Sequence, residues 1–441
     1  MVKHTFKTIT EQAKDIEENR LSPLTLLEEY FYNISKQHKP ENIFTEVFKE
    51  NALKEASDSQ KRQRSGLRKS PLDGIPINWK DLFDIEGKAC EGGSLLLAGR
   101  ISKKDADIVV NANNCGLINL GKTHLSELAF SGLGVNPKTA TPPNSSKKEI
   151  APGGSSSGAA VATALYLSSA GIGSDTGGSV RIPAAWNNLV GFKPTHGNLS
   201  LNGALQLCPS FDTAGPITRT VQDSCYLYDA LRGEKLKVIE ESNLNKKKFL
   251  VDRSFLTKDL SPEVNRSFEI ALEKIRMAGA LINEIEIDEI NEAISLASTL
   301  FPYEAYNSWK ETIENEPDKM YPPILTRFRG GLSINDRQYK SSWRKLTVLR
   351  GFFVKKLSGY DSLLAPTCPI LPPKVTDLMN SEDYFTNCNL LSLRNTRVAN
   401  LLGLTSITIP TETNNSGLML LANPHCEQTI LQTAKLLEGL N

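Results

Sequence analysis

The sequence predicts an α/β protein, a sheet covered by helices, and three segments carry this prediction. Ile75 to Trp79 is a mostly apolar run of strand length, Ala106 to Ala112 has the pattern of a helix, and Leu117 to Gly121 resembles a second short buried strand. This order of strand, helix and strand is typical of a βαβ unit, whose sheet lies beneath helices. A chain of 441 residues can hold two or three average domains, but α/β proteins with one large sheet also reach this length.

Two helices are expected near the N-terminus. Apolar residues recur at helical spacing from about Thr8 to Gln37, with a break at Leu21 to Pro23. Ser22 suits the N-cap of the second helix, and the proline that follows it suits the first helical position. The charged segment from Ala52 to Arg68 predicts an exposed helix that ends near Gly66.

The middle of the chain alternates between loops and regular elements. Pro137 to Pro152 is rich in Pro, Asn, Ser and Lys and predicts a surface loop. The alanines of Gly158 to Ser169 predict a tightly packed helix, because small side chains allow neighbouring backbones to approach closely. Gly233 to Lys248 is charged and rich in Asn and Lys, which predicts an exposed connection.

The next segments predict a helix, a strand and a mainly helical region. Ser261 and Pro262 begin an amphipathic helix that Gly279 is placed to end, and Leu281 to Ile287 alternates like a strand. Ile290 to Leu357 is predicted to be helical, with breaks near Pro317 to Pro323 and at Gly330-Gly331. The aromatic run Phe301, Tyr303, Tyr306 and Trp309 has helical spacing, which fits core packing or the wall of a pocket.

Charge and hydropathy exclude several classes of protein. With 51 basic and 50 acidic residues the net charge is +1, so no global field favours a nucleic acid, a membrane surface or a polyanion. The polar N-terminal segment lacks the apolar region of a secretory signal, and no window approaches the roughly 18 apolar residues of a membrane span. We therefore expect a soluble cytoplasmic protein that does not insert into membranes.

Cysteine and histidine give no sign of a metal centre. The seven cysteines (Cys90, Cys115, Cys208, Cys225, Cys368, Cys388 and Cys426) are scattered and form no CxxC pair, which favours reduced thiols over disulfides or zinc. The five histidines (His4, His38, His124, His196 and His425) include no pair at the spacing of metal ligands, and none lies in a protease-like context. No metal or organic cofactor is expected.

The most informative stretch is Ala151 to Ser200, where two Gly-Gly-Ser turns flank the alanine-rich segment. A glycine pair lets the backbone approach another group closely, and a serine after it stands on a tight, open turn. These serines are Ser155 and Ser179. Successive backbone N–H groups from Thr176 through Gly177 and Gly178 to Ser179 are candidates to converge on one point, as the donors of an oxyanion hole must.

Each serine also has a plainer explanation. Ser179 could be an ordinary turn serine, and Ser155, Ser156 or Ser157 could cap the following helix. A nucleophilic serine needs a base, and Lys80, at the end of the strand Ile75 to Trp79, is the best candidate because a buried lysine loses its charge readily. Lys80 could instead be a strand-end lysine that reaches solvent.

Five blocks of this sequence resemble, in order, those of the amidase signature family. They read PLDGIPINWKDLFDIEG, GKTHLSELAFSGLG, APGGSSSGAA, GSDTGGSVRIPAAWNNLVGFKPTHG and DTAGPITRTVQD. The resemblance continues at Tyr360 to Pro373 and Asn400 to Thr411, and it is thinnest between about Lys235 and Lys355. It implies the amidase-signature fold, a large mixed central sheet sandwiched between helices.

The resemblance also implies a catalytic relay of serine, cis-serine and lysine. Carried over block by block, Ser179 is the nucleophile of an acyl-enzyme, Ser155 the bridging serine and Lys80 the general base. Ser155 is chosen over Ser156 because its separation from Ser179 matches the family's pattern, and Ser156 is left a supporting role.

Three further residues receive roles near the relay. Ser131 matches a family position that faces the substrate. Asp175 and Arg181 flank the oxyanion turn and either support it through an ion pair or are plain surface charges.

The resemblance implies one domain over residues 1–441. In this division residues 60–232 form the signature core, 233–355 a variable and mainly helical cover over the active site, and 356–441 a C-terminal part that completes the core. The expected activity is hydrolysis of a carboxylic amide with release of ammonia or an amine. A small-molecule amide is the expected substrate, and a homodimer is possible.

Two other functions stay open. The A subunit of glutamyl-tRNA(Gln) amidotransferase would share the relay, release ammonia from glutamine and work with partner subunits and tRNA. That subunit commonly carries an acidic residue near its C-terminus that holds the glutamine amino group, whereas the matching stretch from Ala422 to Glu427 places Cys426 there. A catalytically silent family member is the third possibility, and intact Lys80, Ser155 and Ser179 argue against it.

Overall fold

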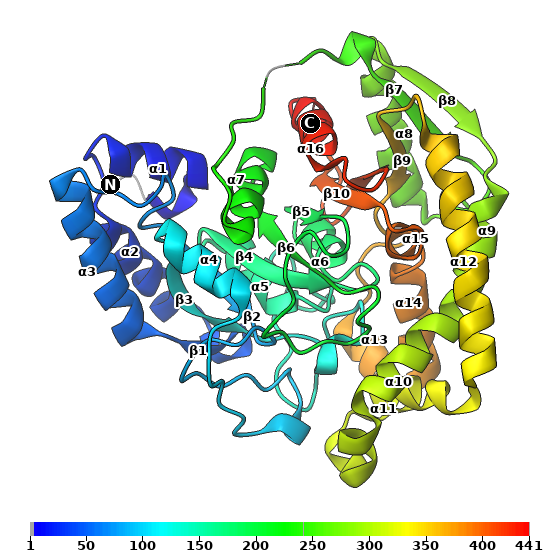
Figure 1. Cartoon of the computed structure of the whole chain (residues 1–441), viewed down its shortest axis with the longest axis horizontal. Coiled ribbons are helices and arrows are strands. Elements are labelled where there is room, and N and C mark those ends of the chain that lie inside the picture. Colours follow the sequence, from blue (N-terminus) through cyan, green and yellow to red (C-terminus); the bar gives the residue numbers. More distant parts are fainter. Residues whose placement is uncertain (1–3, 241, 441) are drawn as a thin grey trace.

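One mixed sheet of eleven strands organises the molecule (Figure 1). The structure is a computed structural model that describes residues 4–240 and 242–440. The sheet order is β1-β3-β2-β4-β6-β5-β10-β11-β9-β7-β8. The strands are β1 (Phe44–Val47), β2 (Pro76–Lys80), β3 (Ile118–Thr123), β4 (Ala170–Asp175), β5 (Val190–Lys193), β6 (Thr213–Thr218), β7 (Lys248–Asp252), β8 (Leu281–Ile285), β9 (Ser362–Pro366), β10 (Thr405–Pro410) and β11 (Gly417–Ala422).

Parallel pairing is confined to two groups of strands. β2 pairs in parallel with both β3 and β4, and β7 pairs in parallel with both β8 and β9. The other neighbours are antiparallel. The prediction of a mixed α/β sheet is therefore confirmed, and the predicted strands near Ile75 and Leu117 are β2 and β3.

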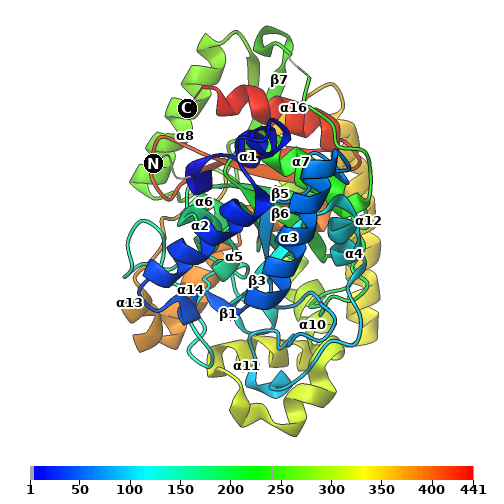
Figure 2. The ribbon, with the colours of Figure 1, turned by 90° about the vertical axis from the view of Figure 1, so that its left-hand side faces the viewer.

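Helices cover both faces of the sheet and the end that carries β1 and β3. They are α1 (Ile9–Glu17), α2 (Pro23–Lys36), α3 (Lys49–Ser65), α4 (Asp107–Cys115), α5 (Ser157–Ala164), α6 (Arg181–Trp186), α7 (Val221–Arg232), α8 (Pro262–Met277), α9 (Asp288–Ser295), α10 (Ala297–Asn315), α11 (Pro322–Arg329), α12 (Asp336–Leu357), α13 (Val375–Asn380), α14 (Glu382–Ser392), α15 (Thr396–Leu402) and α16 (Glu427–Glu438). Figure 2 shows α2 and α3 over the end of the sheet that carries β1 and β3.

Two apolar clusters lie against the sheet. The smaller cluster joins α5 and α6 to Ile217 of β6, and every residue in it is buried. The larger cluster includes the inward faces of α4, α7 and α16, which pack in a row. Because helices cover both faces of the sheet, most strands are buried along their whole length.

The predicted N-terminal helices are confirmed, and their capping residues explain where they begin and end. The Ser22 hydroxyl accepts a hydrogen bond of 3.0 Å from the Thr25 amide at the start of α2. Gly66 follows α3 with φ of 72°, a left-handed conformation that glycine adopts at low cost.

The alanine-rich helix is shorter than predicted. α5 covers Ser157–Ala164, whereas the sequence predicted a helix as far as Ser169. Tyr166 adopts φ of 56°, which is incompatible with a continuing helix, and the chain reverses there to enter β4. The predicted tight packing is present at Gly158, where a Cβ atom would lie only 2.7 Å from the Ile43 carbonyl oxygen.

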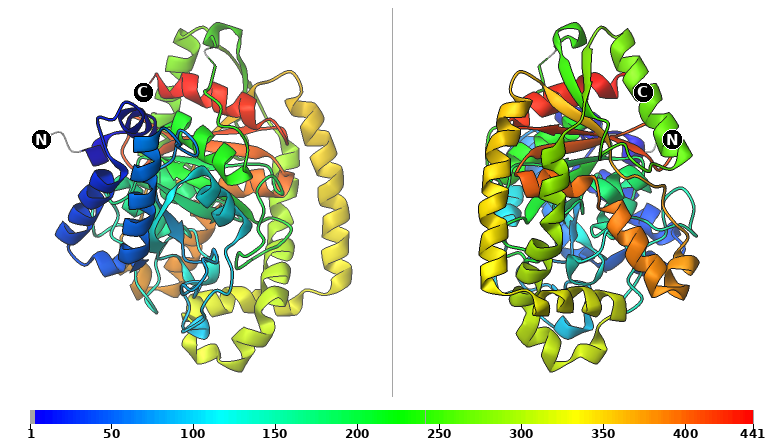
Figure 3. Two further views of the ribbon diagram at one scale, coloured as in Figure 1. Left: turned by 60° about the vertical axis from the view of Figure 1, so that its left-hand side comes forward. Right: turned by 90° about the vertical axis from the view of Figure 1, so that its right-hand side faces the viewer.

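The region from β7 to α12 follows the prediction with one correction. α8 begins at Pro262 and ends just before Gly279, and the helices α9 to α12 break at the expected prolines and glycines. The strand predicted from Leu281 to Ile287 ends at Ile285, because the chain turns toward β7 and the Ile287 amide donates to the Asp252 carboxylate at 3.0 Å. Figure 3 shows α10 and α12 side by side along one flank of the molecule.

Within the described residues, no helix combines the length and the apolar character that a bilayer crossing demands.

Candidate active site

The end of β2 brings Lys80 into the interior. All five residues of β2 are buried, and Lys80 has 0% of its surface exposed. The parallel register sets Trp79 beside Ile172 of β4, so Lys80 lies level with the last residues of that strand. The expectation that this strand carries an ammonium group inside is confirmed, and the alternative of a solvent-reaching lysine is excluded.

The Lys80 ammonium group contacts two serine hydroxyls. Its Nζ atom lies 2.7 Å from Ser155 Oγ and 2.8 Å from Ser174 Oγ. Burial lowers the pKa of Lys80 to about 7, although the negative charges of Asp175 and Asp212 act to raise it. A substantial fraction of Lys80 is therefore neutral at physiological pH, as a general base must be.

Ser155 stands in the first Gly-Gly-Ser turn, just before α5. The Gly154–Ser155 peptide bond is cis, and Ser155 is completely buried. Two backbone hydrogen bonds fix the turn, from the Gly154 amide to the Gly132 carbonyl at 2.8 Å and from the Ser126 amide to the Ser155 carbonyl at 3.1 Å. This turn therefore points one serine hydroxyl at the lysine.

The three consecutive serines have different partners. The Ser156 hydroxyl donates to the Ser174 carbonyl, and the Ser157 hydroxyl donates to the His124 carbonyl. Ser155 is the one of the three whose hydroxyl lies within hydrogen-bond distance of Lys80. None of the three hydroxyls caps α5, since the N-cap residue Ser156 makes no capping hydrogen bond with its side chain.

Ser179 stands in the second turn, after β4, and the two turns are joined directly. The Ser156 amide donates to the Ser179 carbonyl at 3.2 Å. Ser179 is 4% exposed, and this small exposed part opens into a pocket. The two turns therefore lie against each other.

The backbone donors of the second turn differ from the expectation. The Gly178 amide donates to the Asp175 carboxylate at 2.8 Å, so it does not point at a common oxyanion position with its neighbours. The amides of Gly177 and Ser179 have no acceptor among the residues that the structure describes. The predicted convergence of successive donors from Thr176 to Ser179 is thus wrong for Gly178.

Asp175 and Arg181 form a buried ion pair behind this turn. The Arg181 guanidinium donates to both carboxylate oxygens, at 2.8 and 3.0 Å, and both side chains are fully buried. Burial alone would raise the pKa of the Asp175 carboxyl, but the charge and hydrogen bonds of Arg181 hold it well below its usual range. Asn400 bonds to both partners. The alternative of plain surface charges is excluded.

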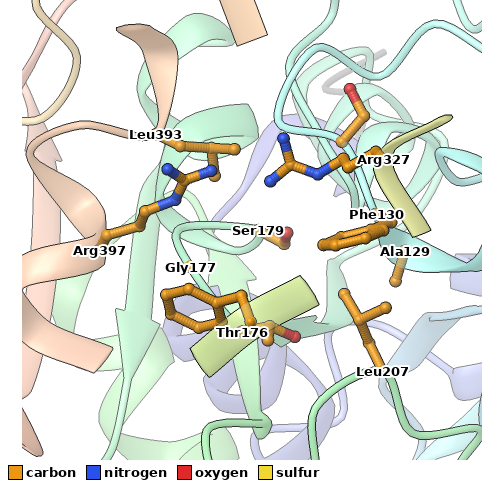
Figure 4. A pocket seen from close by; sticks show the side chains of 11 residues that line it. Ala129, Phe130, Thr176, Gly177, Ser179, Leu207, Arg327, Leu393 and Arg397 are labelled. Atoms are coloured by element: carbon orange, nitrogen blue, oxygen red, sulfur yellow. The ribbon is translucent and has the colours of Figure 1, made fainter. Parts of the chain in front are cut away.

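A pocket lies beside Ser179 (Figure 4). Its lining combines the second turn, the segment after β3, the loop before β6 and residues at or beside α10, α11, α14 and α15: Ala129, Phe130, Ser131, Thr176, Gly177, Ser179, Leu207, Phe301, Arg327, Leu393 and Arg397. Ser131 thus borders the same space as Ser179, with its hydroxyl donating to Asn389 at 3.2 Å. Of the predicted aromatic run, Phe301 forms part of the wall.

Sequence reasoning missed four residues at this site: Ser174, Asp212, Arg327 and Arg397. Ser174 precedes Asp175 in the signature block, so the sequence contained it. What places its hydroxyl beside Lys80 is the parallel pairing of β2 with β4, and that pairing was not predicted. Asp212 accepts a hydrogen bond of 2.5 Å from the Thr176 hydroxyl. No sequence signal relates Arg327 to Arg397, which come from separate segments.

Among the described residues, no cysteine or histidine side chain makes a hydrogen bond to Lys80, Ser155 or Ser179. Each of the seven cysteines is a free thiol. His196 is held by the Asp212 carbonyl at 2.8 Å, and His124 by the Glu41 carbonyl at 3.0 Å. Among residues 4–240 and 242–440, no group of three His, Cys, Asp or Glu side chains is arranged to hold a metal ion.

The fold and this serine and lysine cluster agree with the family that the sequence resembles. A sequence model of the family described as Amidase matches residues 25–431. This match covers most of the chain, so the chain belongs to the amidase signature family.

Relatives and solved structures give the same result. The chain is 30% identical over 385 residues to 2-amino-5-chloromuconic acid deaminase of Comamonas testosteroni, with 84% of this chain and 82% of that protein covered. It is 29% identical over 467 residues to the A subunit of glutamyl-tRNA(Gln) amidotransferase from Prochlorococcus marinus (strain AS9601), with 96% of each covered. A crystal structure of an amidase matches with a TM-score of 0.89 at 30% identity, covering 98% of this chain and 99% of the other. The predicted amidase-signature fold is confirmed.

Proposed function

We propose that this protein hydrolyses a carboxylic amide through an acyl-enzyme on Ser179, with Ser155 as the bridging serine and Lys80 as the general base. The observation that carries the proposal is the contact of 2.7 Å between Lys80 Nζ and Ser155 Oγ, in a completely buried environment. Membership of the amidase signature family supports the reaction class, and the Comamonas relative is named as a deaminase.

The proposed reaction begins with proton transfer along the relay. Neutral Lys80 accepts the proton of the Ser155 hydroxyl, Ser155 accepts the proton of Ser179, and Ser179 Oγ bonds to the amide carbonyl carbon. The C=O electron pair moves onto oxygen and gives a tetrahedral oxyanion. Free amide groups at Gly177 and Ser179 are the candidate donors to that oxygen.

Collapse of the tetrahedral intermediate breaks the C–N bond. The proton on Lys80 returns through Ser155 to the leaving nitrogen, so ammonia or an amine departs and an ester remains on Ser179. Water then attacks the ester carbonyl and gives its proton to the same relay. The C–Oγ bond breaks, Ser179 regains its proton, and a carboxylic acid is released.

Asp175 and Arg181 are proposed as positioning residues. Their ion pair lies behind the turn, and Asp175 accepts from the amides of Gly178 and Val180 at 2.8 and 3.1 Å. An ionised carboxylate makes stronger hydrogen bonds than a neutral acceptor, which favours one fixed conformation of the turn. Ser131 is proposed to face the substrate and Ser156 to support the turn.

A second candidate function is the A subunit of a glutamyl-tRNA(Gln) amidotransferase, because relatives of that name align over nearly the whole chain. Against it, Cys426 occupies the place where that subunit commonly has an acid, and the neighbouring Glu427 is engaged by the Thr195 amide at 2.8 Å. Co-purification with partner subunits and tRNA-dependent glutaminase activity would favour this function. Free-standing hydrolysis of small amides would favour the first.

The test of the first proposal is ammonia release from a panel of aliphatic, aromatic, ureido and amino-acid amides. Ser179→Ala is expected to abolish turnover and to retain the fold, as measured by circular dichroism. Ser157→Ala is the matched control, because its hydroxyl bonds to the His124 carbonyl, and it should remain active. Full activity of a folded Ser179→Ala protein would reject the assignment.

A serine-directed fluorophosphonate probe separates an active enzyme from a silent family member. Labelling of Ser179 requires an activated hydroxyl, so Lys80→Ala should abolish labelling while Ser157→Ala keeps it. Absence of labelling together with absence of turnover across the panel would favour the silent alternative.

A further inference from the structure

Two arginines from separate elements meet in the pocket beside Ser179. Arg327 belongs to α11 and Arg397 to α15, and both line the pocket. Figure 4 shows their guanidinium groups pointing toward one another on the same side of Ser179. Arg397 also lies against the second turn, since a Cβ atom on Gly177 would be 3.3 Å from its Cγ atom.

Neither guanidinium has a carboxylate partner among the residues that the structure describes. Each guanidinium lies over an aromatic ring, with the guanidinium carbon of Arg327 at 4.4 Å from the centre of the Phe130 ring and that of Arg397 at 5.8 Å from the centre of the Phe301 ring. Nε of Arg327 is buried and has no hydrogen-bond partner. Ring faces attract cations but do not use the directional N–H donors.

Neighbouring arginines are satisfied in the usual way. Arg329, two residues from Arg327, pairs with Glu314 at 2.7 Å, and Arg394, three residues from Arg397, donates to the Lys258 carbonyl at 2.6 Å. Arg327 and Arg397 therefore differ from these two neighbours in the sequence.

Two like charges in such a place are costly unless an anion joins them. Burial lowers the pKa of Arg397 to about 9, with the charge of Arg327 adding to the effect, and burial lowers the pKa of Arg327 to about 10. Both remain protonated at neutral pH and repel each other. A planar carboxylate accepts paired hydrogen bonds from guanidinium groups and would offset this repulsion.

We propose that Arg327 and Arg397 bind a carboxylate on the acyl part of the substrate, so that the preferred substrates are monoamides of short dicarboxylic acids. This inference rests on the proposed amide hydrolysis, since it names the substrate class of that same site. The carbon chain between the two carbonyl groups would lie against the apolar part of the lining, such as Phe130, Leu207 and Leu393.

The lining also argues against an amino group on the substrate. No acidic side chain is among the eleven residues that line the pocket, all of which the structure describes. An α-ammonium group would lie near two guanidinium charges with no carboxylate to hold it. The pocket should therefore prefer glutaramate to glutamine, which differ only by that amino group.

A binding experiment tests the anion site without requiring catalysis. The Ser179→Ala protein is titrated by calorimetry with glutaramate and with the neutral amide butyramide. Binding of glutaramate should be detected, and binding of butyramide should not. In the double variant Ser179→Ala with Arg397→Met, glutaramate should bind at least about 30-fold more weakly, because the carboxylate of the ligand then loses one of its two guanidinium partners. Arg394→Met and Arg329→Met are matched controls and should bind as Ser179→Ala does.

Arg397→Lys guards against a folding defect. It keeps the charge but loses the planar pair of donors, so binding should fall between those of the parent and Arg397→Met. Equal binding of glutaramate by the parent and by folded Arg397→Met and Arg327→Met proteins would overturn the inference.

Turnover by the protein with Ser179 intact separates this inference from the proposed function. A kcat/KM at least tenfold higher for glutaramate than for butyramide and glutamine is expected. Arginine-dependent glutaramate binding without hydrolysis of any amide would reject the proposed function and keep the anion site. Efficient hydrolysis of neutral amides without glutaramate binding would keep the function and reject the anion site.

Discussion

The ionisation of Lys80 can be tested through the pH dependence of amide hydrolysis. The proposed relay requires neutral Lys80, whose pKa burial lowers to about 7. The neutral fraction is then about one tenth near pH 6, half near pH 7 and nine tenths near pH 8. The kcat/KM value should therefore rise roughly tenfold across this interval and then reach a plateau.

The assay is ammonia release under kcat/KM conditions, with circular dichroism at each pH to show that the protein stays folded. An exposed lysine with an ordinary pKa of 10.5 would be only about 0.3% neutral near pH 8, and the rate would keep rising for more than two further units. Such a continued rise, or a flat profile, would refute the reasoning.

A charge substitution provides a second measurement of the same group. The carboxylate charge of Asp212 acts to raise the pKa of Lys80, so Asp212→Asn should move the midpoint of the profile to lower pH. The Thr176 hydroxyl loses an ionised acceptor in this variant, so the plateau rate is also expected to fall. An unchanged midpoint would mean that the profile reports another group.

Stability offers a readout that does not depend on catalysis. Between pH 7 and 10.5 an unfolded chain holds a proton on Lys80 that the native protein has lost, so the free energy of unfolding should rise with pH there. Lys80→Met should lose this part of the rise in urea denaturation. The contribution of Lys193, whose pKa burial also lowers to about 7, remains in both proteins.

Two further substitutions test the turn that carries Ser179. Gly178 has φ of 137° and a Cβ atom there would overlap the Thr396 hydroxyl, so Gly178→Ala should lower both kcat and the free energy of unfolding, the latter by about 1–3 kcal/mol. Gly197→Ala is the control for backbone strain alone, because Gly197 has φ of 85° and no atom lies within 4 Å of the new Cβ. An equal loss of unfolding free energy in the two variants would contradict the steric argument. Asp175→Asn leaves the Arg181 charge buried without a counter-ion and should cost about 3–5 kcal/mol in urea denaturation. A change below about 1 kcal/mol would show that the pair is dispensable.

Local signals in the sequence predicted much of the fold. The Ser22 cap, the glycine after α3 and the break before α11 act within a few residues, so they can be recognised without the rest of the chain. The end of α5 was mispredicted because Tyr166 turns the chain toward a distant strand, β2, which pairs with β4. The division of the chain into a core, a cover and a C-terminal part stays a prediction.

The relay residues could be proposed from sequence because a family pattern relates their positions. Their surroundings could not, since the partner of the Gly178 amide and the meeting of Arg327 with Arg397 depend on how α11 and α15 pack. Arg327 lies where the resemblance is thinnest, and substrate choice is the property least fixed by the shared blocks.

The strand order has a consequence for how the protein is made. Lys80, Ser155 and Ser179 all precede β5, but β5 pairs on one side with β10, whose residues Thr405–Pro410 are translated much later. Until β10 is made, the free edge of β5 in the nascent chain has no partner strand. The strands β7, β8 and β9 cannot join the sheet before then either, because β10 and β11 lie between them and β5. The ribosome therefore delivers Ser155 and Ser179 well before the sheet that encloses them is complete.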